Sequence, residues 1–163
     1  MSVIDDIGIL AIATRMQRLA ERMRKDGLLI YKAHGIDFEP KWFPVVYTLY
    51  LKSAQSVVEL ANEIGYSHPS TIALLKELEK LKLTRSGKDK TDERKRLVQL
   101  TEKGKELIAK MEPVWNIMIA ATTQLTDTKN NIMKAMEEVE QQLEMQSFYQ
   151  RALVIMAANE SKK

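Results

Sequence analysis

The 163-residue sequence contains no cysteine. This absence excludes disulfide bonds, thiolate metal sites and a redox switch built on cysteine. There is also no run of about 18 apolar residues, the length that a transmembrane helix requires. The start of the chain carries Asp5 and Asp6 in place of the basic segment of a secretory signal. We therefore expect a cytoplasmic protein without a membrane partner.

The residues that most enzyme active sites need are also scarce. The chain has only two histidines, no glycine-rich phosphate loop and no H-E-x-x-H pattern. The sequence shows no recognisable Ser-His-Asp catalytic triad. A zinc site that combined His34 and His68 with carboxylates would follow no known ligand spacing. The sequence therefore predicts neither enzyme activity nor a cofactor or metal.

The charges are distributed unevenly along the chain, although the net charge is only +3. Basic residues concentrate between Lys76 and Arg96, while the segment from Glu137 to Glu144 is acidic. A basic stretch of this kind suits local contact with phosphates. A solvated surface of mixed charges is the alternative when the composition is taken alone.

Two long helical segments enclose the basic region. Apolar periodicity predicts a helix over residues 3–33, ended by Gly35, and a last helix over 129–159, entered through a cap at 126–128. Between them lies a helix that Thr101 caps and that runs toward Leu125. The first and last helices carry wider apolar stripes than a small domain can cover, which predicts a homodimer.

The middle of the chain has the order of a winged helix-turn-helix. A helix from Pro40 or Pro44 to Leu51 precedes a capping box at residues 56–59, whose helix stops at Gly65. Ser67 then caps a second helix, with a predicted buried stripe of Ile72, Leu74, Leu75, Leu78 and Leu81. Strands at 83–86 and 94–100 flank a charged loop, and Val98 and Leu100 face inward. The second helix is narrow enough for a DNA major groove, and the loop suits a minor groove.

These segments resemble the MarR family of transcriptional regulators over residues 35–104. The matching motifs are Ser56-Val57-Val58-Glu59-Leu60-Ala61 with Ile64-Gly65, Ser67-His68-Pro69-Ser70, Leu74-Leu75-Lys76-Glu77-Leu78-Glu79, and Asp92-Glu93-Arg94 followed by Leu100-Thr101-Glu102-Lys103-Gly104. The expected fold is mainly α with a small β wing, a winged helix-turn-helix flanked by long N- and C-terminal dimerisation helices. The regions would be 1–34 for dimerisation, 35–104 for DNA binding and 105–163 for dimerisation, within one compact domain.

The resemblance implies a homodimer that binds double-stranded DNA at a near-palindromic operator. It places Arg94 in the minor groove and gives Asp92 the role of supporting the wing. Together with the exposed positions expected for the second helix and the loop, it predicts these DNA-binding residues: Ser67, His68, Ser70, Thr71, Lys76, Arg85, Lys88, Lys90, Arg94 and Lys95. Many members are repressors that release DNA when a small phenolic or similar ligand binds.

A small aromatic or phenolic effector is therefore expected as a second partner. Its candidate pocket consists of Trp42, Phe43, Tyr47, Tyr50, Met111 and Trp115. The alternative is that aromatic residues at helical spacing are plain core.

The chain departs from the family pattern at three positions. Ile72 and Ala73 stand where threonine and arginine are frequent, and Lys82 stands where glycine is common. These departures keep a second hypothesis open, a winged-helix module for protein contacts without specific DNA binding.

Overall fold

The computed structural model describes residues 2–88 and 96–161, which form two compact units, 1–118 and 119–163. The sequence had led us to expect one compact domain. Unit 1 contains α1 (Val3–Asp6), η1 (Gly8–Ala11), α2 (Ile12–Ala33), η2 (Pro40–Trp42), α3 (Phe43–Lys52), β1 (Gln55–Ser56), α4 (Val57–Ile64), α5 (His68–Lys80), β2 (Thr84–Lys88), β3 (Arg96–Leu100) and the first part of α6 (Glu102–Thr126). Unit 2 contains the rest of α6, then α7 (Ile132–Met145) and α8 (Phe148–Glu160).

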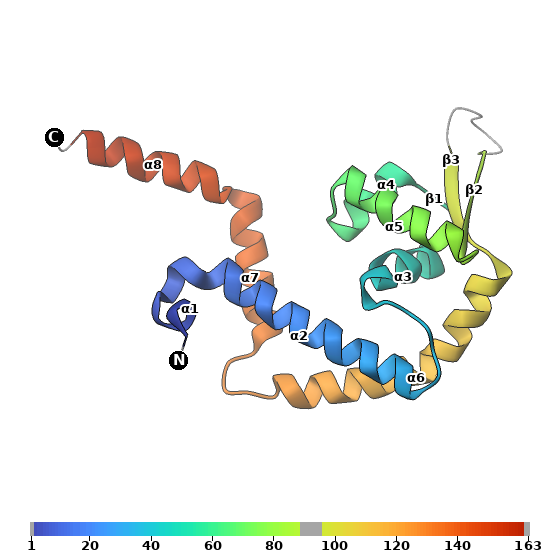
Figure 1. The fold of residues 1–163 in the computed structure, drawn as a ribbon. Coiled ribbons are helices and arrows are strands. Elements are labelled where there is room, and N and C mark those ends of the chain that lie inside the picture. The colour runs from blue at the N-terminus through green and yellow to red at the C-terminus, as the bar shows by residue number, and fades with distance from the viewer. Residues whose placement is uncertain (1, 89–95, 162–163) are drawn as a thin grey trace. The chain divides into compact units, whose positions relative to one another are not determined.

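The structure confirms the mainly helical fold with a small β wing. The sheet is antiparallel in the order β1-β3-β2, and Thr84 pairs with Leu100 while Lys88 pairs with Arg96. Figure 1 shows α4 and α5 beside the hairpin of β2 and β3, the arrangement of a winged helix-turn-helix. The short strand β1 was not predicted, because two residues are too few to show an alternating pattern.

The core of unit 1 is one cluster of aromatic and aliphatic side chains. Phe38 is fully buried, and its ring makes edge-to-face contacts with Tyr31 at 5.2 Å and Trp42 at 5.6 Å. The aliphatic part includes Leu78 and Ile108, which are also buried. Val98 and Leu100 face inward as predicted. Burying this apolar surface is the main stabilising contribution to the unit.

The predicted stripe on α5 is only partly correct. Leu74, Leu75 and Leu78 are buried, whereas Leu81 is exposed and Ile72 is half-buried. A three-residue step falls about 60° short of a full helical turn. Ile72 and Leu81 are separated by three such steps, so they cannot share one face.

Both long terminal helices are interrupted, so the two continuous helices predicted from the sequence are wrong. The first breaks into α1, η1 and α2 at Gly8, whose φ of 71° is a left-handed conformation that favours glycine. A capping box of Ser2 and Asp5 starts the short α1. Apolar periodicity continues through such a break, so the periodicity could not reveal the break.

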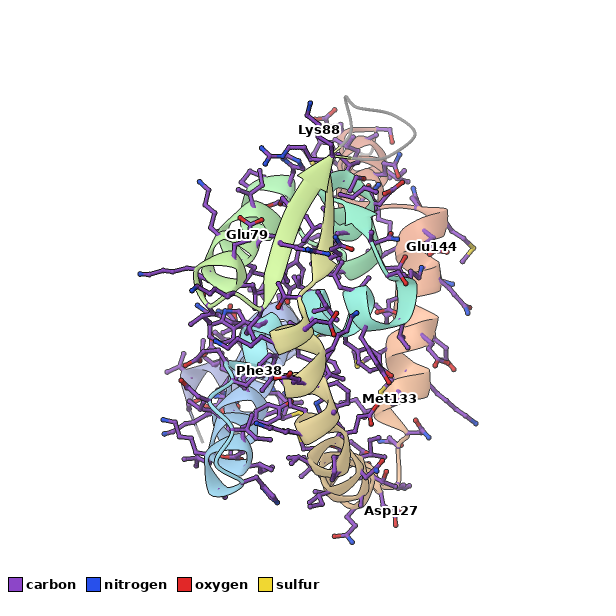
Figure 2. All side chains as sticks on the ribbon, turned by 90° about the vertical axis from the view of Figure 1, so that its right-hand side faces the viewer. Phe38, Glu79, Lys88, Asp127, Met133 and Glu144 are labelled. Carbon is purple, nitrogen blue, oxygen red and sulfur yellow. The ribbon has the colours of Figure 1, made fainter. Side chains whose placement is uncertain are left out.

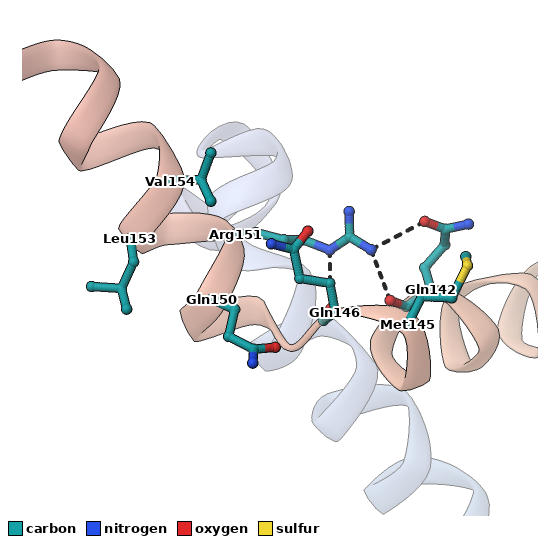
Figure 3. Close-up of a pocket in the computed structure, with 7 residues that line it drawn as sticks. All are labelled: Gln142, Met145, Gln146, Gln150, Arg151, Leu153 and Val154. Atoms are coloured by element: carbon teal, nitrogen blue, oxygen red, sulfur yellow. Dashed lines mark hydrogen bonds between the residues drawn. The ribbon is translucent and has the colours of Figure 1, made fainter. Parts of the chain in front are cut away.

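The last helix breaks between α7 and α8. Asn131 caps α7 by accepting from the backbone of Lys134 at 3.1 Å, so the cap predicted at residues 126–128 is not the one used. Ser147 and Gln150 form a capping box that starts α8. Arg151 holds this corner by donating to the backbone oxygens of Gln142 at 2.7 Å and Gln146 at 3.1 Å (Figure 3).

The end of α5, the start of the wing and the first turn of α6 are packed closely together. The backbone of Lys82 has a φ of 61°, the left-handed conformation that explains why glycine suits this position. Thr101 caps α6 as predicted, accepting from the backbone of Gly104 at 3.1 Å, and its hydroxyl donates to the Lys82 oxygen at 2.6 Å. A Cβ at Gly104 would lie 2.3 Å from the Leu83 carbonyl oxygen. Only glycine fits there without moving the backbone.

We predict that Gly104→Ala lowers the free energy of unfolding by about 3 kcal/mol, the upper end of the range for overpacking. The added methyl group would push the start of α6 away from Leu83. Urea denaturation followed by circular dichroism measures the change. Gly87→Ala is the matched control, because a Cβ at Gly87 would meet no atom within 4 Å. Equal stability of the two variants would contradict the close approach.

Candidate nucleic-acid interface

The first turn of α5 presents a polar, exposed surface. Gly65 ends α4 with a φ of 69°, and Ser67 then caps α5 by accepting from the backbone of Ser70 at 3.3 Å. The Ser67 and Ser70 hydroxyls lie 2.8 Å apart. Ser67, His68 and Ser70 are all exposed. Three of the four predicted base-reading residues of this turn are therefore together on one accessible surface.

Thr71 does not belong to that surface, and its prediction as a base-contacting residue is wrong. Its side chain is fully buried. Its hydroxyl donates to the carbonyl oxygen of Ser67 at 3.1 Å. Thr71 follows the cap by one helical turn, and a hydroxyl there bonds back to the preceding turn. Its role is to hold the start of α5.

Basic side chains extend from α5 to the wing. Lys76, Arg85 and Lys88 are exposed, and Lys88 stands at the outer end of β2 (Figure 2). With its amide turned to satisfy both groups, Gln99 accepts from Arg85 Nε at 3.1 Å and Nη2 at 3.2 Å. Arg85 is thus pre-positioned on the sheet by its cross-strand partner.

The other wing residues of the prediction lie outside the described residues. These are Lys90, Asp92, Arg94 and Lys95. Their assignment to DNA contact and wing support therefore stays a prediction.

An ion pair anchors α5 to the segment before α3. Glu77 of α5 accepts from Lys41 Nζ at 2.7 Å and from the indole N–H of Trp42 at 2.8 Å. The Lys41 ammonium and, secondly, the Trp42 indole hold the pKa of the Glu77 carboxyl below its usual range. The pair fixes α5 about two helical turns beyond its polar first turn.

We predict that this anchor weakens in acid. The depressed pKa of Glu77 means that its stabilisation is complete above the ordinary glutamate pKa and is lost as pH falls through the lower, folded-state value. The stability difference between wild type and Glu77→Gln should therefore be largest near pH 7 and shrink toward pH 3. Thermal unfolding at both pH values measures it. Glu106→Gln, an exposed change on α6, is the control. A difference that is independent of pH would contradict the ion pair.

The six residues of the predicted effector pocket fall into two groups. Trp42 and Met111 are buried in the core, as the plain-core alternative had it. Phe43, Tyr47 and Trp115 form a cluster with ring centroids 5.1–5.6 Å apart, and Tyr50 adjoins Tyr47 at 6.4 Å. These four are partly exposed. The structure thus assembles four of the six residues and excludes two.

Polar groups border the aromatic cluster. The Tyr50 hydroxyl donates to Glu112 Oε1 at 2.6 Å, and the adjacent carboxylate raises the pKa of Tyr50. The Trp115 indole donates to the Tyr31 hydroxyl at 2.9 Å. His34 lies at the C-terminal cap of α2, with Nδ1 at 2.9 Å from the Ile30 oxygen. Among the described residues, no group of three or more potential ligands is placed to hold a metal ion.

Sequence reasoning missed the residues that position the interface. Glu77 holds α5, Gln99 holds Arg85, and Lys103 donates to the Leu81 oxygen at 2.9 Å. Their partners lie 36, 14 and 22 residues away in the chain. No local pattern signals pairs at that separation.

The comparisons with known proteins show the same architecture. No family model matches the sequence, and no curated protein matches it. Solved structures do: the transcriptional regulator MOSR from M. tuberculosis in complex with DNA has a TM-score of 0.69 at 19% identity, over 82% of this chain and 96% of that one. A mutant of MarR from E. coli complexed with operator DNA has a TM-score of 0.67 at 15% identity, over 88% of this chain and 99% of that one.

The chain has the MarR fold. A third neighbour is BpsR from Bordetella bronchiseptica, whose DNA binding is described as regulated by 6-hydroxynicotinic acid; its TM-score is 0.52 at 18% identity, over 91% of this chain and 99% of that one. At these identities the likeness establishes the MarR fold itself. Within the described residues, no helix is long and apolar enough to cross a membrane.

Proposed function

We propose that this protein is a MarR-family transcriptional regulator that binds double-stranded DNA sequence-specifically. The observation that carries the proposal is the exposed polar turn of Ser67, His68 and Ser70 beside Lys76, Arg85 and Lys88. Neighbours of the same fold were solved with DNA bound, which supports the assignment. The expected location is the cytoplasm, where DNA is accessible.

The recognition helix α5 would enter the major groove with its first turn leading. Ser67, His68 and Ser70 would contact base edges or phosphates, and the N-terminal helix dipole adds a positive field. Ala73 is exposed on the same helix and offers an apolar contact to a thymine methyl group in place of a polar one. Lys76, Arg85 and Lys88 would neutralise backbone phosphates.

Two copies would act together on a near-palindromic operator. In unit 1 the exposed apolar side chains include Ile9, Leu10, Met16 and Leu19, and in unit 2 they include Met133, Val139, Leu143, Phe148 and Tyr149. Such surfaces are too extensive for a protein that functions as a monomer. A symmetric pair of winged helices reads two half-sites.

Release of DNA when a small effector binds would make the protein a ligand-responsive repressor. The partly exposed cluster of Phe43, Tyr47, Tyr50 and Trp115 suits a small aromatic molecule through ring stacking. The printed description of BpsR provides a precedent within the fold. The effector would act by binding the DNA-incompetent arrangement more tightly than the DNA-bound one.

We predict that Lys76→Ala/Lys88→Ala reduces the slope of log K against log salt concentration by about 2, since each lost phosphate contact removes close to one released counterion. The probe is DNA from upstream of the protein's own gene, and fluorescence anisotropy measures the affinity. Lys110→Ala, an exposed lysine of α6, is the control and should leave the slope unchanged. An unchanged slope in the double variant would contradict the phosphate contacts.

The same titration separates the two candidate functions. Specific binding by the wild type supports the regulator. Binding that is equally weak to every DNA sequence would favour the protein-interaction module, the second hypothesis from the sequence.

The wing is tested separately through Arg94. Arg94→Ala should weaken operator binding by about 1–3 kcal/mol if the side chain makes a close groove contact. A gel shift on the same DNA measures this. Operator affinity equal to that of the wild type would overturn the wing assignment.

A further inference from the structure

The partly exposed aromatic cluster of Phe43, Tyr47, Tyr50 and Trp115 continues into the core of unit 1. The ring of Trp115 on α6 makes edge-to-face contacts with Phe43 at 5.6 Å and with Tyr47 at 5.4 Å. The Trp115 indole also donates to the Tyr31 hydroxyl on α2 at 2.9 Å. Because Tyr31 is buried, this hydrogen bond connects the cluster to the interior.

Ring contacts continue the series from Tyr31 to α5. Tyr31 meets Phe38 edge-to-face at 5.2 Å, and Phe38 meets Trp42 edge-to-face at 5.6 Å. Phe38 and Trp42 are buried, and the Trp42 indole donates to Glu77 of α5 at 2.8 Å. Four residues therefore join the cluster to α5, and we call them the aromatic link: Trp115, Tyr31, Phe38 and Trp42.

The aromatic link has physical properties that allow a change at one end to affect the other. Its inner rings lie in a closely packed interior, which cannot deform continuously. Edge-to-face pairs favour particular orientations, so a turn of one ring changes the favoured orientation of the next. Loss of the Trp115 hydrogen bond would deprive the buried Tyr31 hydroxyl of this donor, a cost that a turn of the Tyr31 ring would reduce.

The two ends of the aromatic link lie on different elements. Trp115 is on α6, whereas Glu77 is on α5. Within the described part of the chain, no hydrogen bond or ion pair joins these two side chains directly. A direct polar interaction therefore does not couple them, and the aromatic link is the series of contacts that connects them.

We propose that Tyr31, Phe38 and Trp42 are positioning residues, which couple the aromatic cluster energetically to Glu77 and so to the placement of α5. The inference deepens the proposed function, and it rests on that function in treating the cluster as an effector surface and α5 as the helix that enters DNA. A small aromatic molecule stacked on Trp115 would turn the indole, and the contact with Glu77 would change in response. The response is thus assigned to buried side chains that touch neither the ligand nor DNA.

A double-mutant cycle tests the coupling, because contact alone does not establish it. Trp115→Phe keeps an aromatic ring in the cluster and removes the N–H, and Glu77→Ala removes the acceptor at the other end. Urea denaturation gives the unfolding constant of each variant. For independent sites the two fold-changes multiply to within about twofold, whereas we expect the double variant to be at least about threefold more stable than that product. Loss of either end already loosens the link, so the second loss has less effect.

Tyr50→Phe is the matched control for Trp115→Phe. The Tyr50 hydroxyl belongs to the same cluster but donates to Glu112, which lies outside the aromatic link. The effects of Tyr50→Phe and Glu77→Ala should therefore multiply. Coupling of equal size in this control would overturn the proposal, and so would a Trp115→Phe cycle that multiplies.

The route is tested by repeating the cycle in a Tyr31→Phe background, which removes one hydroxyl and keeps the ring. Trp115→Phe and Glu77→Ala should then multiply, because the bond whose loss is transmitted is already absent. Phe43 offers a shorter route, since it contacts Trp115 and follows Trp42 directly in the chain. Coupling that persists without the Tyr31 hydroxyl would assign transmission to Phe43 and overturn the aromatic link.

Phe38→Leu interrupts the aromatic link at a second point and keeps the site apolar. The effects of Trp115→Phe and Glu77→Ala should multiply in this background as well. Coupling that survives Phe38→Leu but not Tyr31→Phe would overturn the assignment of Phe38 as a positioning residue.

DNA binding separates this inference from the proposed function. Trp115→Phe should weaken binding to the DNA upstream of the protein's own gene by about threefold or more, because α5 is less well preorganised. The slope of log K against log salt concentration should not change, since no phosphate contact is lost. Wild-type affinity, or a changed slope, would overturn the role of the link in placing α5.

The two sets of measurements fail independently. Coupling in urea by a protein whose wild type binds no specific DNA would overturn only the regulator. Specific DNA binding by the wild type, together with cycles that multiply, would overturn only the aromatic link.

Discussion

The close approach of Gly104 to the Leu83 carbonyl is the constraint on which the winged region depends. At this point the end of α5, the start of β2 and the first turn of α6 share one small volume. Thr101 completes the junction, because its hydroxyl bonds to the backbone on both sides of it. The hairpin and the recognition helix therefore hold a fixed mutual position. The proposed contact of both elements with one DNA duplex would need that rigidity, since both must fit the same duplex.

A second anchor holds α5 further along the helix than its first turn. Glu77 binds Lys41 and Trp42, while the exposed first turn stays free for contacts. Thr71 contributes from within the helix, its buried hydroxyl bonded to the capping residue. The polar surface is thus carried by a helix whose other contacts are already satisfied. Less conformational freedom is lost when such a preorganised surface binds.

Local signals predicted the winged region well and the terminal helices less well. The capping boxes and caps at Ser56, Ser67 and Thr101 are short motifs with a direct physical cause, and each appears in the structure as expected. The apolar periodicity continues through the breaks at Gly8 and Ser147. It therefore predicted a continuous helix in each place. Thr71 was misassigned because its place in the first turns of the helix suggested an exposed side chain. That expectation did not include the packing of α4 on α5. Glu77 required a contact across 36 residues, which no single stretch of sequence reveals.

The two tryptophans lie at separate points of the same unit. Trp42 donates to Glu77 of the recognition helix, and Trp115 donates to Tyr31 of α2 from within the aromatic cluster. Indole emission responds to the loss of such hydrogen bonds and to the polarity around the ring. The chain therefore contains two tryptophan fluorophores. Trp42 reports on the contact between α5 and the segment before α3, and Trp115 reports on the proposed effector surface. When either tryptophan is replaced by phenylalanine, the indole emission comes from the other one alone, without any attached dye.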